Sequence, residues 1–204
     1  AIFALLIVAS VYLYFAAPWQ ESSGFNLIEV PRGDMVSMTL SDGTKVWLNA
    51  DTRFSYPDRF GSKNREVTLD GEAFFEVAHN EKKPFIVNGG NFSIEVLGTE
   101  FNVKAHKNEE AEISLKTGKV QITDANDTNR KVLMKPNEQV RYSVDGKMTL
   151  SQIDLSYVDN WRNGGLAFIS QPLSAIVKTL ERKYIVNITL DDNELGNEIF
   201  SCRT

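Results

Sequence analysis

Cysteine and histidine are scarce in this sequence of 204 residues, which contains one cysteine, Cys202, and two histidines, His79 and His106. A single cysteine cannot form an internal disulfide or supply a cysteine-rich zinc site. Two histidines alone do not define a metal site either. We therefore expect no metal and no cofactor, and we interpret Cys202 as a small structural or surface residue.

The sequence also lacks the common catalytic motifs: it has no G-x-S-x-G, H-E-x-x-H, P-loop or G-x-G-x-x-G pattern. Glu72 and Glu76 are the most plausible carboxylate pair, but along one strand they stand roughly 13 Å apart. Glycosidase carboxylates lie roughly 5–9.5 Å apart, so this pair is too wide. We interpret both as solvent-facing charges beside Phe74. We expect no enzyme, although a carboxylate from another strand could complete a hydrolase site.

Basic residues are outnumbered by acidic ones, 22 Lys and Arg against 27 Asp and Glu, which gives a formal net charge of -5. Nucleic-acid binding needs a concentrated basic surface, so this balance excludes nucleic acid as the expected partner. Hydrophobic residues make up 42% of the chain. That content and the length suffice for at least one ordinary hydrophobic core.

The first residues form a long apolar run. Residues 1–17 carry no charge, and as a helix they would span roughly 25 Å, the lower limit for crossing a bilayer. Pro18 would end the helix, and cleavage after Ala17 would place the large Phe15 where signal peptides need a small residue. We predict a transmembrane helix over residues 1–18 and a linker over 19–29. Because no Lys or Arg follows until Arg32, the remainder is expected outside the cytoplasm.

Residues 30–150 alternate between apolar and polar positions, as β-strands do. Ala73, Phe75 and Val77 would share one strand face, and turn sequences occur at 41–44, 70–71 and 88–91. Strand-length runs at this spacing predict a mainly β domain, which would be a sandwich, a jelly-roll or a short β-solenoid. Residues 124–129 look like the start of a calcium loop but lack its later Gly and Glu, so we interpret them as a hairpin loop.

The pattern changes in residues 151–204. Strand 166–169 is followed by a helix that would open at Pro172 with Ser170 as its cap. Apolar residues then recur at helical spacing, and further strands are expected at 185–190 and 199–200. On this reading Lys178, Glu181 and Arg182 lie on the polar face of the helix. We predict a partial, truncated small α+β (βαβ) domain.

Several blocks, taken in order, resemble FecR-type regulators of anti-sigma factor systems. They are residues 40–50 (LSDGTKVWLNA), 54–57 (FSYP), 67–77 (VTLDGEAFFEV), 84–87 (PFIV), 96–103 (VLGTEFNV) and 115–120 (LKTGKV). Residues 161–168 (WRNGGLAF) and 180–184 (LERKY) resemble the carboxyl-terminal domain of Bacteroidetes-like versions. That domain is similar to the short signalling domain of secretins and TonB-dependent transducers.

The resemblance implies a single-pass inner-membrane protein whose bulk is periplasmic. It would relay a signal from an outer-membrane TonB-dependent transducer to an extracytoplasmic-function sigma factor, which would bind a cytoplasmic segment that this sequence lacks. Exposed strand edges or the outer helix face could bind the transducer. The candidate partner-binding residues are Leu166, Phe168, Lys178, Glu181, Arg182 and Phe200.

Two other functions stay open at this point. A membrane-anchored carbohydrate- or ligand-binding β-domain would need an exposed aromatic platform, for which Trp47, Tyr56 and Phe60 are candidates. We expect these three side chains to lie in or against the core instead. A scaffold of the cell envelope is the other alternative, and the sequence alone does not separate it from a signalling protein.

Overall fold

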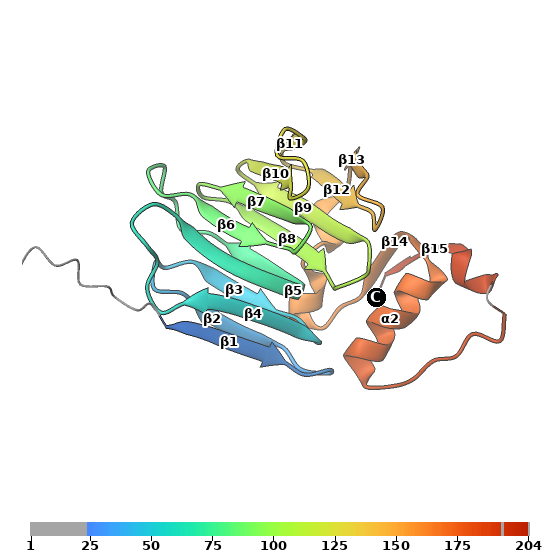
Figure 1. Ribbon diagram of the computed structural model, residues 1–204. Coiled ribbons are helices and arrows are strands. Elements are labelled where there is room, and N and C mark those ends of the chain that lie inside the picture. Colours follow the sequence, from blue (N-terminus) through green and yellow to red (C-terminus); the bar gives the residue numbers. More distant parts are fainter. Residues whose placement is uncertain (1–23, 193, 204) are drawn as a thin grey trace, which may run out of the picture.

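The computed structural model describes residues 24–192 and 194–203 and consists of a large β-rich part followed by a small part with one α-helix (Figure 1). The predicted transmembrane helix over residues 1–18 lies outside the described residues. Within them, no helix has the length and apolarity needed to cross a membrane. The prediction of a mainly β protein is confirmed.

The β-rich part, which we call the body, extends from Phe25 to Gln152. It starts inside the segment that the sequence suggested as a linker, because residues 25–30 form a strand. Its strands are β1 (Phe25–Val30), β2 (Val36–Thr39), β3 (Lys45–Leu48), β4 (Thr52–Pro57), β5 (Arg65–Glu76), β6 (Phe85–Asn88), β7 (Phe92–Val96), β8 (Glu100–Ala105), β9 (Ala111–Thr117), β10 (Val120–Asp124), β11 (Lys131–Met134), β12 (Glu138–Tyr142) and β13 (Met148–Gln152).

All strands of the body belong to one continuous 13-stranded sheet. The first half of β5 pairs with β4 and β6, and its second half pairs with β3 and β8. The sheet therefore folds over at β5 into two layers, β1-β4-β5-β6-β7-β10-β11 and β2-β3-β5-β8-β9-β12-β13, which gives a barrel-like body. This continuity distinguishes it from the separate sheets of a sandwich and from the repeating coils of a solenoid.

The fold-over is centred on Gly71, in the middle of β5. Its φ is +136°, and a Cβ there would lie 2.4 Å from Thr52 Oγ1. Only glycine tolerates this combination of backbone angle and close approach. The sequence prediction of a turn at Asp70–Gly71 was wrong, because the strand continues through both residues and changes layer instead of reversing direction.

The core lies between the two layers and is rich in phenylalanine. The predicted inward face of Ala73, Phe75 and Val77 is confirmed, since all three side chains are buried. Phe75 stacks on Phe101 with ring centres 5.1 Å apart, and it contacts Phe85 at 6.0 Å. Phe85 belongs to one layer and Phe101 to the other, so the Phe75 side chain packs against both layers and stabilises their contact.

The charged side chain of Arg65 is also inside the body. Only 2% of it is exposed, and its Nη1 lies 2.8 Å from Asp42 Oδ2. The guanidinium also donates to the carbonyls of Lys83 and Ala78 and lies over the Phe85 ring. Because Asp42 in turn accepts from Thr44, this buried pair fixes the predicted turn at residues 41–44.

The loop at residues 124–129 contains no calcium-like arrangement. Asp124 is buried and accepts hydrogen bonds from the Tyr142 hydroxyl and the Asn126 amide. Its Oδ2 also lies 3.5 Å from Arg130 Nη1. These contacts use the carboxylate within the protein, and no group of metal-binding side chains occurs among the described residues. The loop connects β10 to β11, as the hairpin interpretation requires.

The small part, which we call the carboxyl-terminal module, covers residues 155–203. It contains η1 (Leu155–Tyr157), η2 (Asn160–Asn163), β14 (Ala167–Pro172), α2 (Leu173–Tyr184), η3 (Leu195–Asn197) and β15 (Ile199–Arg203). Strands β14 and β15 pair antiparallel with a bulge between Phe168 and Gln171. Ser170 sits in this bulge with φ +49° and does not cap the helix, whose N-cap is Pro172.

The strand predicted at residues 185–190 does not form. Ile185 ends α2 in the left-handed conformation, with φ +56°. The Ile188 amide donates to the Glu181 carboxylate, 2.8 Å away, and Val186 remains exposed. The apolar alternation of this segment is therefore not used for strand pairing among the described residues.

Candidate functional site

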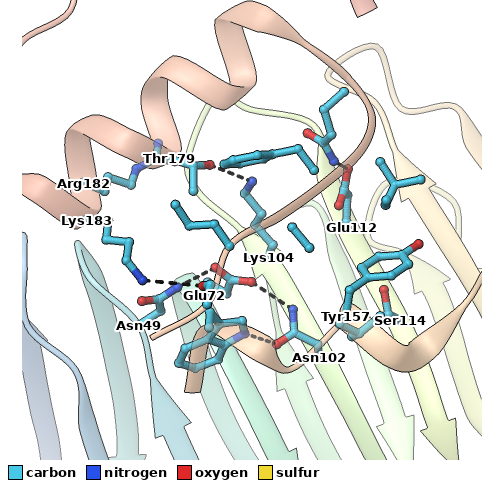
Figure 2. A pocket seen from close by; sticks show the side chains of 18 of the residues that line it. Asn49, Glu72, Asn102, Lys104, Glu112, Ser114, Tyr157, Thr179, Arg182 and Lys183 are labelled. Atoms are coloured by element: carbon cyan, nitrogen blue, oxygen red, sulfur yellow. Dashed lines mark hydrogen bonds between the residues drawn. The ribbon is translucent and has the colours of Figure 1, made fainter. Parts of the chain in front are cut away.

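The most distinctive site lies where the module covers the outer face of one body layer. A cavity of about 110 Å³ lies between α2, η1, η2 and β14 on one side and β5, β8, β9 and β12 on the other. Figure 2 shows helix α2 crossing the sheet, with polar side chains of both parts directed into the space between them. The labelled residues are Asn49, Glu72, Asn102, Lys104, Glu112, Ser114, Tyr157, Thr179, Arg182 and Lys183.

Glu72 is at the floor of this cavity. One carboxylate oxygen accepts from Asn49 Nδ2 at 2.8 Å, and the other accepts from Asn102 Nδ2 at 3.0 Å. The Asn102 amide oxygen then accepts from the indole Nε1 of Trp161 at 3.1 Å (Figure 2). The interpretation of Glu72 as a solvent-facing charge was therefore wrong: its carboxylate begins a hydrogen-bond chain that ends in the module.

Glu76, the other predicted surface charge, also contacts the module. Its carboxylate lies 3.4 Å from Arg162 Nη1, and Arg162 Nη2 lies 2.9 Å from Asp159. The Arg162 guanidinium carbon lies 4.1 Å from the centre of the Phe74 ring and 4.5 Å from that of Trp47. These contacts explain why Phe74, although it points away from the core, is fully buried.

The same contacts remove the proposed aromatic platform. Trp47 lies beneath Arg162, whereas Tyr56 and Phe60 pack against the core of the body, as expected. The cavity itself is smaller than the roughly 300–1,000 Å³ that is usual for ligand pockets. A carbohydrate-binding function therefore has no support from this site.

Helix α2 contacts the body through polar side chains. Lys104 Nζ of the body donates to Thr179 Oγ1 of the helix at 3.1 Å (Figure 2), whereas Lys183 Nζ donates within the module, to the Gly164 carbonyl at 2.5 Å. At the other end of the cavity, Gln171 Nε2 donates to Glu112 Oε1 at 2.6 Å. These hydrogen bonds add polar contacts to an interface whose aromatic part is Trp47 and Phe74 beneath Arg162.

Arg182 makes two ionic contacts with the body. Its guanidinium pairs with the Glu109 carboxylate and lies 3.4 Å from Asp51 Oδ2. Its carbonyl accepts from the Gly33 amide at 2.8 Å. Burial alone would raise the pKa of Glu109, but the hydrogen bond and positive charge of Arg182 outweigh it and hold that pKa below its ordinary value. Arg182 thus connects the helix to three separate loops of the body.

His106 lies beside this ion pair and is buried. Its pKa is lowered from 6.5 to about 3, first because burial disfavours the charged ring and second because Arg182 is positively charged. His106 is therefore neutral at physiological pH. A buried, neutral ring beside an ion pair is consistent with a structural residue.

The structure separates the predicted partner-binding residues into two groups. Leu166 lines the cavity, Phe168 is buried within the module, and Arg182 faces the body instead of the outer face of α2. Lys178 is half-exposed but is 3.3 Å from Glu109, and Glu181 is engaged by the Ile188 amide. Phe200, on β15, is 46% exposed and remains accessible.

Sequence reasoning missed the residues that join the two parts. Trp161 and Arg162 contact residues 59 and 86 positions earlier in the chain. No local pattern connects positions so far apart. The sequence singles out residues 161–168 only through the family resemblance, which does not identify the partners of Trp161 and Arg162.

Comparisons with known proteins agree with this two-part organisation. Residues 26–121 match the family described as FecR protein, and residues 165–204 match the family described as FecR, C-terminal. Two crystal structures of "a putative anti-sigma factor from Parabacteroides distasonis ATCC 8503", at 2.50 and 1.65 Å resolution, are similar to this chain. Each is 37% identical with a TM-score of 0.83, covering 88% of this chain and 84% of the other. No curated protein matches.

Proposed function

This chain belongs to the FecR family, and from that membership we propose that it is the sensor part of an anti-sigma factor, anchored in the inner membrane by residues 1–18. In this role it regulates a sigma factor and does not convert a substrate. The extracytoplasmic-function sigma factor would be bound by a cytoplasmic segment upstream of residue 1. The body and the module would lie in the periplasm and receive the signal there.

The observation that carries the proposal is the contrast between the two sides of the module. One side is joined to the body by Arg162, Arg182 and the Glu72 hydrogen-bond chain. The other side presents β15, a strand with every described residue exposed, including Ile199 and Phe200. An exposed strand edge with apolar side chains is suited to adding a strand from another protein.

The proposed partner at β15 is the periplasmic signalling domain of an outer-membrane TonB-dependent transducer. Its binding would shift the position or the stability of the module and so alter the contacts of the module with the body. A small polar interface suits this task because binding energies of a few kcal/mol are enough to shift such an equilibrium.

The test is a titration of the full-length protein in detergent or nanodiscs with signalling domains of TonB-dependent transducers from the same organism. Phe200→Glu should weaken binding by at least tenfold, because it places a charge on the strand edge. Leu133→Glu is the matched control, since Leu133 is also exposed, on edge strand β11 of the body.

Two results would contradict the proposal. One is that no transducer domain binds; the other is that both variants weaken binding equally. In cells, deletion of the gene should change transcription from promoters of one extracytoplasmic-function sigma factor, and protease added to spheroplasts should degrade the body. Protection of the body in intact spheroplasts would contradict the periplasmic location.

A further inference from the structure

The end of the body at which the chain enters combines exposed basic and apolar side chains. We call it the entry end; it comprises the start of β1 and the loops at residues 57–64 and 79–84. These segments meet there, because the Asp58 amide donates to the Gly24 carbonyl at 2.9 Å and Lys83 Nζ donates to the Phe60 carbonyl at 3.3 Å. Helix α2 and strands β14 and β15 of the carboxyl-terminal module lie at the opposite end of the body (Figure 1).

Charge at the entry end is opposite to that of the whole chain. The two loops contain Arg59, Lys63, Lys82 and Lys83 but only two acidic residues, Asp58 and Glu81. In the full sequence, acidic residues outnumber basic ones by 27 to 22. Arg59, Lys63 and Lys82 are exposed, and none of them makes an ion pair with another described residue. Their charge is therefore available to an external anion.

Apolar side chains accompany these charges. Phe25, the first residue of β1, is 73% exposed, and Leu97 is exposed in a turn whose carbonyl accepts from the Asn80 amide. Leu27 follows on the exposed face of β1. Basic side chains next to exposed apolar ones are the combination that binds the headgroup region of a membrane containing anionic lipids.

The length of the connecting chain also favours a membrane as the occupant. The uncharged apolar run ends at Ala17, and Gly24 is already beside Asp58 of the body. Residues 18–24 can span at most about 24 Å in any conformation. If residues 1–17 are in a bilayer, the entry end cannot move far from the bilayer surface.

We propose that the entry end, with Phe25, Arg59, Lys63 and Lys82, docks on the anionic lipid surface of the membrane that holds residues 1–18. The docking directs the carboxyl-terminal module away from that membrane. Strand β4 indicates the separation, because it runs from Thr52, beside the Arg182 contact at Asp51, to Pro57 at the entry end. The proposal rests on the membrane anchoring proposed above.

The test places a nitroxide at each end of the full-length protein in vesicles of phosphatidylethanolamine and phosphatidylglycerol. One label is attached to native Cys202, which is exposed in the module, and the other to the variant S62C/C202S, between Arg59 and Lys63. Lipids that carry nickel on their headgroups should accelerate relaxation of the Ser62 label several-fold and leave the Cys202 label unchanged. Equal effects at both labels would overturn the proposal.

Charge variants distinguish docking from mere tethering. R59Q/K63Q/K82Q should reduce the nickel effect at the Ser62 label several-fold, and so should vesicles of phosphatidylcholine alone. K131Q/K135Q/K147Q removes the same charge from exposed positions outside the entry end and should have no effect. Docking would be overturned if the nickel effect at the Ser62 label stayed the same in phosphatidylcholine vesicles and in R59Q/K63Q/K82Q. Failure of the protein to float with the vesicles would instead refute the anchoring and, with it, the docking.

Discussion

The guanidinium carbon of Arg162 lies 4.1 Å from the centre of the Phe74 ring, although the two residues belong to different parts of the chain. Phe74 lies on the outer face of β5, where an exposed phenylalanine would be unfavourable. Arg162 covers it and places its two amino groups on Glu76 and Asp159. A cation over an aromatic ring gains more when both are shielded from water, so this contact is central to the interface.

Replacing Arg162 by Ala should release the module from the body without unfolding the body. The loss of the ring contact and of two ion pairs should weaken the interface by about 2 kcal/mol. Hydrogen–deuterium exchange should rise about tenfold or more in residues 159–184 and stay unchanged in β5 and β8. Arg53→Ala is the control, because its ion pair with Glu29 is exposed and should contribute little. Unchanged exchange in the module would contradict this role of Arg162.

His106 should make the stability of the body depend on pH. Its pKa in the folded protein is about 3, below the ordinary 6.5, so between these values the unfolded chain binds a proton that the folded chain does not. As pH falls below 6.5, the free energy of unfolding should therefore decrease by up to about 1.4 kcal/mol per pH unit. Urea denaturation from pH 7 to 5 measures this slope.

His106→Gln should remove that slope, whereas His79→Gln, at an exposed position, should keep it. The range above pH 5 is chosen because Glu109, whose folded pKa is lowered, loses its contribution only as pH falls below its ordinary value of 4.5. The charges around His106 are Arg182, Glu109, Lys104 and Lys178. Equal slopes in the wild type and in His106→Gln would show that the ring is protonated in the folded state.

Gly71→Ala should destabilise the body by at least about 2 kcal/mol, because the new Cβ requires an unfavourable φ and overlaps Thr52. Gly61→Ala is the control, since a Cβ at Gly61 has no neighbour within 4 Å. The control should be neutral or gain up to about 1 kcal/mol. Thermal unfolding followed by circular dichroism compares the two. Similar melting temperatures for both variants would mean that β5 can fold over without glycine.

Arg65→Met should cost about 3 kcal/mol, because it leaves the largely buried Asp42 carboxylate without its cation. The double variant D42N/R65M should recover part of this loss, since it removes the unpaired charge. Lys63→Met, at an exposed neighbouring position, should change stability by less than about 0.5 kcal/mol. Denaturant titration checks the order of the four proteins. A double variant less stable than Arg65→Met would contradict the explanation.

Local patterns in the sequence were sufficient to predict the β-rich body and its core. The alternation through Ala73, Phe75 and Val77 identifies the inward face of β5 because side chains alternate between strand faces. The same local reading failed at Gly71, where Asp-Gly is usually a turn but here allows one strand to join two layers. Glycine is needed both in a tight turn and where a strand passes close to another backbone, so an Asp-Gly pair in the sequence does not show which of the two is present.

The interface could not be predicted because it depends on contacts between distant residues. The alternation in β5 correctly places Glu72 and Glu76 on one strand face, but the sequence around them contains no sign of the module that covers that face. The apolar stripe of α2 predicts a single buried face, which places Arg182 on the outer face of the helix. The helix instead has two covered sides, one apolar and one polar.

The two ends of the body also determine how it would respond to mechanical force. Strand β1 begins at the end where the chain enters, and α2 is attached at the other end (Figure 1). Tension between these attachments would run along β1 and load its six pairings with β4 in shear, all at once and not one after another. The body is therefore arranged to transmit a pull between its ends while its first strand stays in register.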